Sequence, residues 1–259
     1  MPPLVQAGGD PIPVGARQAG MGYANLTLID LWCTRANQAG LAGLEHTVVG
    51  AFHQQHWLAA ELSMQGAAFA TPLGKGTIAA SVSSFGFELY RQQGAGLAYA
   101  MRLGEGLRAG VQLDHVSVRL GEGYGSHNAL VAQIGVQARL SDALWVGAHL
   151  YNPSRSELGG RYEERIPTVL RAGMGYTFSE QLLMTFTIEK DVDLDERVSA
   201  GIEYHPMKAL FLRTGVATGP VIGTFGAGVR TGRIDIDLAV AVRSRLGPTP
   251  QLGINYRFE

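Results

Sequence analysis

The feature that most constrains this chain is a two-residue alternation of apolar and polar side chains. In RIDIDLAVAVRS, residues 233–244, Ile234, Ile236 and Leu238 alternate with Asp235 and Asp237. Successive side chains of a β-strand point to opposite faces, so this segment would have one apolar and one polar face. Such a strand fits either a water-soluble antiparallel sheet or a barrel that spans a membrane.

Fourteen segments of this kind follow one another from about residue 46 to the C-terminus. They lie near residues 46–55, 58–71, 76–88, 93–103, 107–119, 127–140, 143–152, 167–178, 181–190, 197–205, 209–217, 221–231, 233–244 and 250–259. Glycine, with 35 residues, is about twice as frequent as usual, which is typical of many strands joined by tight turns. A transmembrane helix needs about 18 consecutive apolar residues, and no such run exists. A membrane strand needs only about 10 alternating residues.

The connections between these segments also alternate in length. Every second connection is short, and the short ones lie at residues 72–76, 103–106, 140–143, 178–181, 205–209 and 230–233. The others vary more, and residues 152–167 form the longest and the only one long enough to constrict a pore. An even number of strands with both chain ends on the short-turn side is the pattern of a bacterial outer-membrane barrel.

A barrel of fourteen strands cannot fill its interior with side chains from its own inner face, because eight strands already enclose just that much space. Lipid accepts an apolar outer face, the lumen accepts the polar face, and closure pairs every backbone N–H and C=O group. We therefore predict an all-β fold, a 14-stranded antiparallel transmembrane β-barrel over residues 45–259, with residues 1–44 folded into or against it. The alternative is a large soluble sandwich with the same patterning.

The alternation predicts which polar side chains line the lumen. They include Asp114, Arg139, Arg171, Glu189, Glu203, Arg213, Asp235, Asp237 and Arg243. Their charges nearly balance, so either a bracing network of ion pairs or a polar pathway or ligand site would explain them. Aromatic residues near the predicted strand ends are expected to form interface girdles. These are Trp57, Trp145, Tyr90, Tyr99, Tyr151, Tyr176, Tyr256 and Phe258.

Several functional classes lack support in the sequence. A net charge of -1 offers no field for nucleic acid, so no nucleic-acid partner is expected. Cys33 is the single cysteine, and the seven histidines show no metal-ligand spacing, so we expect no disulfide, metal or cofactor. His149 and His205 could face the lumen of a lipase-like barrel, but no G-x-S-x-G element accompanies them. We therefore expect no catalytic residues and no enzyme. The first residues do not form a signal peptide, so an export signal is expected to have been removed.

Residues 14–44 do not read as barrel strands, and an apolar stretch within them predicts a short helix at about 29–36. This segment resembles the opening of PorV/PorQ proteins, within the FadL-like superfamily, which has the form A-R-A-x-G-M-G-G-A, an acidic pair, then N-P-A-G-L-A. The matching residues are Ala16, Arg17, Ala19, Gly20, Met21, Gly22, Asp30, Asn37, Ala39, Gly40, Leu41 and Ala42. Tyr23, Ile29 and Gln38 depart from the pattern.

The resemblance implies a bacterial outer-membrane barrel whose N-terminal segment folds inward as a hatch. The expected hatch or gating residues are Arg17, Met21, Asp30, Trp32 and Asn37. For a PorV/PorQ protein it implies an accessory subunit of a type IX-like secretion machine, which binds protein partners as well as outer-membrane lipid. The short external loops favour this role. The alternative is a FadL-like channel for hydrophobic small molecules such as fatty acids.

Overall fold

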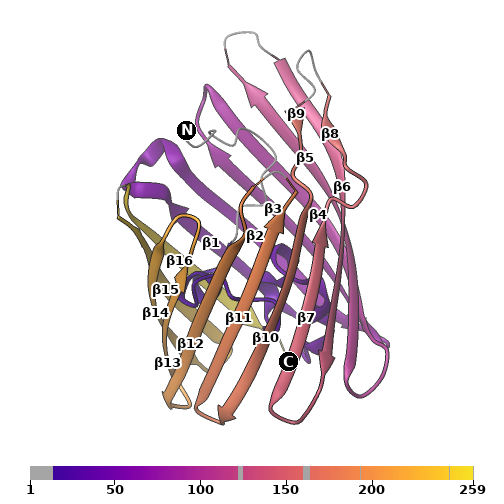
Figure 1. The fold of residues 1–259 in the computed structure, drawn as a ribbon, viewed down its shortest axis with the longest axis vertical. Coiled ribbons are helices and arrows are strands. Elements are labelled where there is room, and N and C mark those ends of the chain that lie inside the picture. Colours follow the sequence, from indigo (N-terminus) through magenta and orange to yellow (C-terminus); the bar gives the residue numbers. More distant parts are fainter. Residues whose placement is uncertain (1–13, 122–124, 160–163, 193, 245, 259) are drawn as a thin grey trace.

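The computed structural model describes residues 14–121, 125–159, 164–192, 194–244 and 246–258. Within them, fourteen antiparallel strands form one closed barrel (Figure 1). The strands are β1 Val48–Gln55, β2 Ser63–Leu73, β3 Gly76–Gly86, β4 Tyr90–Arg102, β5 Leu107–Leu120, β6 Gly125–Arg139, β7 Leu144–Tyr151, β10 Val169–Ser179, β11 Leu182–Asp191, β12 Arg197–Met207, β13 Leu210–Ala217, β14 Ile222–Thr231, β15 Ile234–Arg243 and β16 Gly247–Arg257. Strands β1 and β16 close the barrel, with Ala51 opposite Ile254. The predicted 14-stranded antiparallel barrel is confirmed.

The outer surface of the barrel is apolar and the lumen is mixed. On β15, the outward Ile236 and Leu238 are 38% and 55% exposed, whereas the inward Asp237 and Ala241 are 7% and 4% exposed. The same outward exposure recurs at Leu97, Val111, Ile134, Met174, Phe186, Val216, Phe225 and Ile254. A closed ladder with an apolar exterior suits hydrocarbon, and the soluble sandwich is excluded.

The two ends of the barrel differ in their connections. At one end the strands are joined by turns such as residues 74–75 and 232–233, and β1 begins and β16 ends there. The connections at the other, outer end include residues 56–62 and 152–168. The longest of these contains a separate two-stranded hairpin, β8 Glu157–Leu158 with β9 Glu164–Arg165. The short-turn end is the periplasmic one in barrels of this kind.

Strands β4, β5 and β6 are the longest, with 13, 14 and 15 residues, and rise above the other strands in Figure 1. The polarity of β5 reverses near its outer end. On β5 beyond Asp114, Val116 and Val118 point inward and are buried, while His115 and Arg119 point outward and are exposed. This outer extension therefore has an apolar inner face and a polar outer face, the reverse of the part below.

Three predicted strand starts differ from the structure by three residues or more. Strand β4 begins at residue 90 instead of 93. Strand β2 begins at residue 63 instead of 58, because the chain first makes two 3-10 turns, η3 His56–Leu58 and η4 Ala60–Leu62. Strand β16 begins at residue 247 instead of 250. Residues 248–250 pair with β15 alone, since the pairing with β1 begins at residue 251. A proline on such a free edge leaves no ladder hydrogen bond unmade, so Pro248 and Pro250 are compatible with a strand.

The predicted aromatic girdle is only partly correct. Tyr99 and Tyr176 are outward and more than 40% exposed, and Phe258, just beyond β16, is also exposed. In contrast, Tyr151 is only 4% exposed and belongs to an internal apolar cluster, against which Tyr90 also packs. The alternation of strands β4 and β7 turns these two rings, and that of Trp145, toward the lumen.

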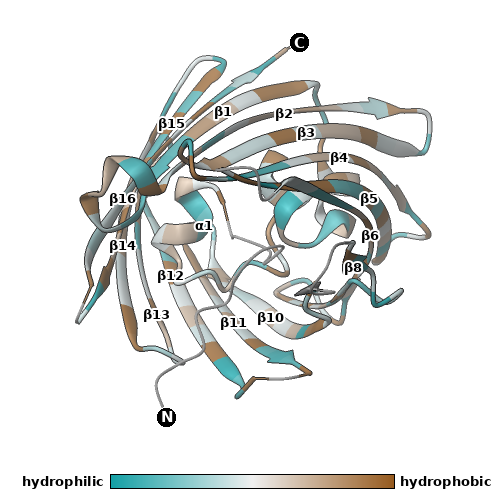
Figure 2. Ribbon diagram, turned by 90° about the horizontal axis from the view of Figure 1, so that it is seen from above, coloured by the Kyte–Doolittle hydropathy of each residue, from teal (hydrophilic) through white to brown (hydrophobic). Residues whose placement is uncertain are grey.

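Residues 14–44, which we call the hatch segment, lie inside the barrel (Figure 2). They contain α1 Ala16–Gly20, η1 Leu31–Arg35 and η2 Gln38–Gly43. The helix expected at 29–36 is thus a 3-10 helix of five residues. Residues 1–13 of the predicted N-terminal segment lie outside the described residues. No helix in the described part of the chain is long and apolar enough to cross a membrane.

Candidate functional site

The hatch segment rests directly on the barrel wall at inward-facing glycines. A Cβ atom on Gly147 would lie 2.7 Å from the Leu26 carbonyl oxygen, and one on Gly110 would lie 2.6 Å from the backbone of Gln38. Further such positions are Gly135 against Asn37, Gly175 against Thr27, Gly201 against Met21 and Gly215 against Gly22. We call these six wall residues the glycine seat. Because they lack side chains, the hatch segment can approach the strands this closely, with its backbone at most of these positions and with the side chains of Thr27 and Asn37 at Gly175 and Gly135.

Hydrogen bonds hold the hatch segment on this seat. The Asn37 side-chain amide donates to the Leu26 carbonyl at 2.9 Å and to the Val136 carbonyl of β6 at 3.1 Å, and its oxygen accepts from the Ala39 N–H. Gln137 of β6 donates to the same Leu26 carbonyl at 2.9 Å. The two bonds to the Leu26 carbonyl satisfy a buried backbone group that lies in no strand or helix.

On the opposite wall, a threonine hydroxyl bridges two backbone groups after α1. Thr224 of β14 donates to the Gly20 carbonyl and accepts from the Gly22 N–H, both at 3.0 Å. The hatch segment is therefore fastened at both sides of the lumen.

A group of charged side chains joins the hatch segment to three strands. Arg17 forms a two-pronged pair with Glu203 of β12, with N–O distances of 2.9 and 2.8 Å, and a third contact with Asp30 at 3.3 Å. Arg213 of β13 binds Glu203 at 2.6 Å and Asp237 of β15 at 2.5 Å. We call these five residues the ion-pair hub. The Glu203 and Arg213 side chains are 1% and 3% exposed, so the centre of the hub is shielded from water and its pairs depend on one another, whereas the Arg17 and Asp30 side chains are 21% and 14% exposed.

On the periplasmic side of the hatch segment lies a cavity of about 440 Å³. The ion-pair hub lines its top. Near its open end, Asp235 accepts hydrogen bonds from Arg230 at 2.8 Å and from Arg257 at 3.3 Å. Apolar groups, including Leu44 and Phe211, also line it. Its charges are mostly paired with one another, so the cavity is a polar vestibule with little net charge.

On the outer side of the hatch segment, the lumen has an apolar lining. The outer cluster consists of Val116, Val118, Ala129, Val131, Tyr151, Leu158, Ile166 and Val169.

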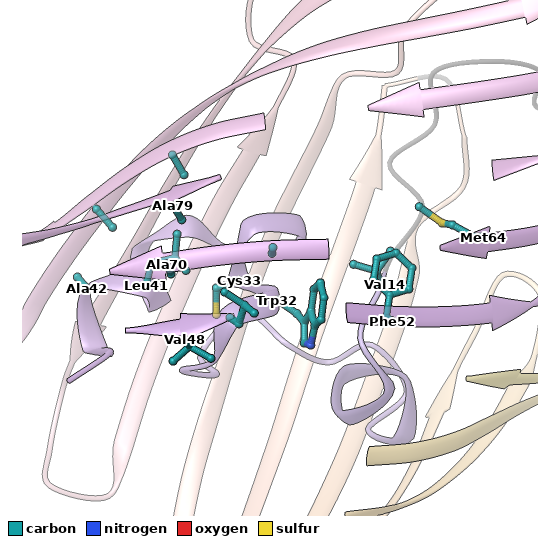
Figure 3. Packing of buried hydrophobic residues seen from close by; sticks show 14 residues of the cluster. Val14, Trp32, Cys33, Leu41, Ala42, Val48, Phe52, Met64, Ala70 and Ala79 are labelled. Carbon is teal, nitrogen blue, oxygen red and sulfur yellow. The ribbon is translucent and has the colours of Figure 1, made fainter. Parts of the chain in front are cut away.

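A second cluster joins the hatch segment to strands β1–β4. Figure 3 shows Trp32, Cys33 and Leu41 of the hatch segment beside Val48 and Phe52 of β1. The Trp32 and Phe52 rings meet edge to face, with their centroids 5.1 Å apart.

The structure places all five expected hatch residues inside the barrel. Arg17 and Asp30 belong to the ion-pair hub, whereas Met21 and Asn37, both fully buried, contact the glycine seat. Trp32 packs in the apolar cluster shared with β1–β4, and Gly15 lies against its ring. Four of the five side chains therefore contact the wall, whereas Asp30 binds Arg17 within the segment.

The nine lumen-facing residues of the sequence analysis form separate groups. Glu203, Arg213 and Asp237 belong to the ion-pair hub, and Asp235 lines the vestibule below it. Above the hatch segment, Asp114 accepts from Gln112 and Gln133.

The remaining four of these residues lie apart from the hub. Arg171 binds Glu189 at 2.6 Å. Arg139 is 39% exposed at the periplasmic rim, beside Asp142, and Arg243 lies over the Trp57 ring at the outer rim.

Sequence reasoning missed the glycine seat and the buried amides. It read glycine as a residue of turns, although the alternation already turned Gly135, Gly175 and Gly201 inward. Gln133 links the Asp114 carboxylate to Gln38 of the hatch segment and to His149.

The lone Cys33 is fully buried, and burial raises the pKa of its thiol well above its usual value. A buried, protonated thiol is unreactive.

The comparisons with known proteins rest on structure. No protein-family model matches the chain. No curated protein matches it either. The chain is similar to the toluene transporter TbuX of Ralstonia pickettii, with a TM-score of 0.71, 14% identity and coverage of 95% of this chain and 98% of TbuX. The chain is also similar to the P. putida toluene transporter TodX, with a TM-score of 0.70 and 13% identity. The match covers 95% of this chain and 99% of TodX.

A Pseudomonas aeruginosa FadL homologue gives a TM-score of 0.68 at 10% identity, with coverage of 98% of this chain and 100% of the homologue. Likeness at such low identity shows the fold alone. Together with the apolar outer surface, it leads to one conclusion: the chain is a barrel of the bacterial outer membrane, with the fold of these transporters and of the FadL homologue.

Proposed function

We propose that this chain is an outer-membrane channel for hydrophobic small molecules. The observation that carries the proposal is the apolar lining of the lumen outside the hatch segment. Val118 and Val131 are 2% and 0% exposed and face inward, where a water-filled porin is polar. An apolar molecule that leaves water for such a surface is stabilised by about 25 cal/mol for each Å² that it buries.

The structural neighbours support the same kind of cargo. Two of them are described as toluene transporters and one as a FadL homologue. The two transporter descriptions name transport, which agrees with a chain for which we propose no catalytic role.

The hatch segment would close this channel. Arg17 and Asp30 would hold it through the ion-pair hub, Met21 and Asn37 through the glycine seat, and Trp32 through the apolar cluster. The other lumen-facing charges, including Arg171 with Glu189, would brace the wall, because adjacent opposite charges on neighbouring strands stabilise a sheet. Leu158 and Ile166 pack within the outer cluster, so passage would require these two side chains to move aside.

The test measures uptake of labelled toluene and of labelled glycerol by proteoliposomes that contain the full chain. We expect toluene uptake to rise above that of empty liposomes and to saturate, with glycerol unchanged. The Val131→Asn variant puts an amide into the apolar lining and should lower toluene uptake several-fold. Ser126→Asn, an exposed position on the same strand, is the matched control and should not.

Equal uptake of toluene with and without the protein would overturn the proposal. Uptake of glycerol at the rate of toluene would also overturn it, because it would indicate a water-filled pore.

A second candidate function is that of a PorV/PorQ-type accessory subunit of a secretion machine. The observation in its favour is the motif of residues 16–22 and 37–42. That motif has a structural explanation of its own, since Gly22 and Asn37 contact the glycine seat and Arg17 contacts Glu203. It supports a hatch segment more than it supports a secretion partner. The neighbours likewise favour the channel.

Affinity purification of the full chain from its native outer membrane tests this second candidate. A large partner that co-purifies in fixed proportion would favour the accessory role. Isolation of the barrel with outer-membrane lipid and no such partner would count against it.

A further inference from the structure

A small hole lies between the outer side of the hatch segment and the wall. Its volume is about 20 Å³. A site of this size holds one water-sized group, because such a group needs about 10–15 Å³. Polar groups that line it include Arg35 of η1, Asp114 of β5 and Gln133 of β6. Around them stand Met64, Phe85, Val116 and Tyr151.

The polar groups of the hole carry almost no net charge but retain free bonding capacity. The Asp114 carboxylate accepts from Gln112 at 2.8 Å and from Gln133, and it is 2% exposed. Each of its oxygens has a further lone pair. Arg171 is neutralised by Glu189. Within the described residues, the Arg35 guanidinium makes no hydrogen bond or ion pair, and the buried Gln112 carbonyl oxygen has no partner.

We propose that this hole recognises the hydroxyl group of a ring-sized, otherwise apolar molecule such as an alkylphenol. The inference rests on the proposed function and specifies its cargo. A hydroxyl group can accept a hydrogen bond from Arg35 and donate one to Asp114 at the same time. Arg35 and Asp114 then each form one more hydrogen bond, and the neutral hydroxyl group adds no charge to the hole.

Two related kinds of molecule fit the hole less well. A pure hydrocarbon leaves the polar groups of Arg35 and Asp114 without a new partner, and a site built for a hydroxyl group discriminates against the analogue that lacks it. A carboxylate would bind Arg35 but would place a second negative charge beside Asp114. It also has two oxygens, for which a hole of about 20 Å³ has no room.

The rim of the hole suits the apolar ring. Val116 and Tyr151 belong to the outer cluster, and Met64 and Phe85 belong to the cluster around Trp32, so the hole lies where the two apolar linings meet. Phe85 packs edge to face with His56, at a centroid distance of 5.5 Å, and with Tyr90, at 6.3 Å. Aromatic rings favour such contacts with one another, and a bound ring would add to this set.

The experiment compares three probes that share one methyl-substituted ring. p-Cresol carries a hydroxyl group, toluene carries none, and 4-methylbenzoate carries a carboxylate. Binding to the purified full chain in detergent is measured by calorimetry, with protein-free micelles subtracted. We expect p-cresol to bind at least about tenfold more tightly than toluene and 4-methylbenzoate, the amount that one hydrogen bond to a charged group contributes.

Two variants connect this preference to the hole. Arg35→Met keeps a long side chain and removes the donors, and Asp114→Asn keeps the shape and removes the charge. Both should reduce the ratio of p-cresol to toluene affinity toward one, and Asp114→Asn should strengthen binding of 4-methylbenzoate. Arg119→Gln, an exposed position on the same strand as Asp114, should leave the ratio unchanged. Heat-dependent gel mobility verifies that each variant forms the barrel.

The outcomes separate the inference from the proposed function. Binding of toluene as tight as that of p-cresol, or a ratio that neither variant changes, would overturn the inference and leave the channel proposal intact. Tightest binding of 4-methylbenzoate would overturn it in favour of an anion site. Binding of none of the probes, with no toluene uptake by proteoliposomes, would overturn both.

Discussion

Glu203 shares one buried carboxylate between Arg17 of the hatch segment and Arg213 of the wall. The alternation correctly turned Glu203, Arg213 and Asp237 toward the lumen. It could not predict their pairing, because a period of two residues gives the face of a strand and not its register with the next strand. In the structure Glu203 lies directly opposite Arg213. The contact with Arg17 spans 186 positions of the chain, and no local pattern contains it.

The Glu203→Gln variant should loosen the hatch segment. Removal of one partner of a buried pair costs about 3–5 kcal/mol, because the other charge is left buried and unpaired. Cys33, the single cysteine, lies between the hatch segment and the wall and is fully buried. We therefore expect maleimide to label Cys33 at least about tenfold faster in the variant than in the original chain.

Glu196→Gln is the matched control, because Glu196 pairs with Lys190 at 2.9 Å on the surface, before β12 begins, and does not belong to the hub. An exposed pair contributes little, so Cys33 labelling should not change. Equal labelling rates in both variants and the original chain would mean that the hub does not hold the hatch segment.

The elements of this fold divide into those that the sequence predicts and one that it does not. The strands follow from alternation and turn residues, and only the start of β2 was misplaced by more than three residues. The hatch segment has too few residues in each helix for a periodic signal, since α1 and η1 have five residues each. Its position depends on the glycine seat, which is spread over β5, β6, β7, β10, β12 and β13 and exists only after the barrel closes.

A single methyl group on the glycine seat should displace the hatch segment. In Gly201→Ala, the added Cβ would collide with the Met21 backbone. Gly223→Ala is the matched control, because nothing lies within 4 Å of the Cβ position on Gly223. We expect faster maleimide labelling of Cys33 in Gly201→Ala and an unchanged rate in Gly223→Ala. A slow rate in both would show that the wall at β12 adapts to the extra atom.

At the scale of the whole molecule, the barrel is too wide for the inward side chains of its own strands to fill its interior. The wall contributes glycine and alanine at many inward positions, and the hatch segment occupies the space that these leave. The need for such a filling follows from the strand number alone, whereas its shape does not. The apolar lining above the hatch segment was not predicted either, because the sequence analysis treated the inward face as polar along its full length.

Deletion of residues 1–44 should leave an open pore. The strands pair without the hatch segment, so the barrel should still form, as measured by heat-dependent gel mobility. In planar lipid bilayers the deletion variant should conduct ions steadily, whereas the full chain should conduct far less. A barrel that folds without these residues and remains non-conducting would mean that other parts of the chain, such as residues 152–168, block the lumen.

If the proposed channel function holds, the reversal of polarity on β5 would set where a dissolved molecule first leaves water. Val116 and Val118 of the outer cluster are buried on the inner face of β5, while His115 and Arg119 are exposed on its outer face. A sparingly soluble compound would be taken directly from the aqueous phase, without first dissolving in the lipid. The rate of uptake would then follow its dissolved concentration outside the cell, and the composition of the outer leaflet would matter little.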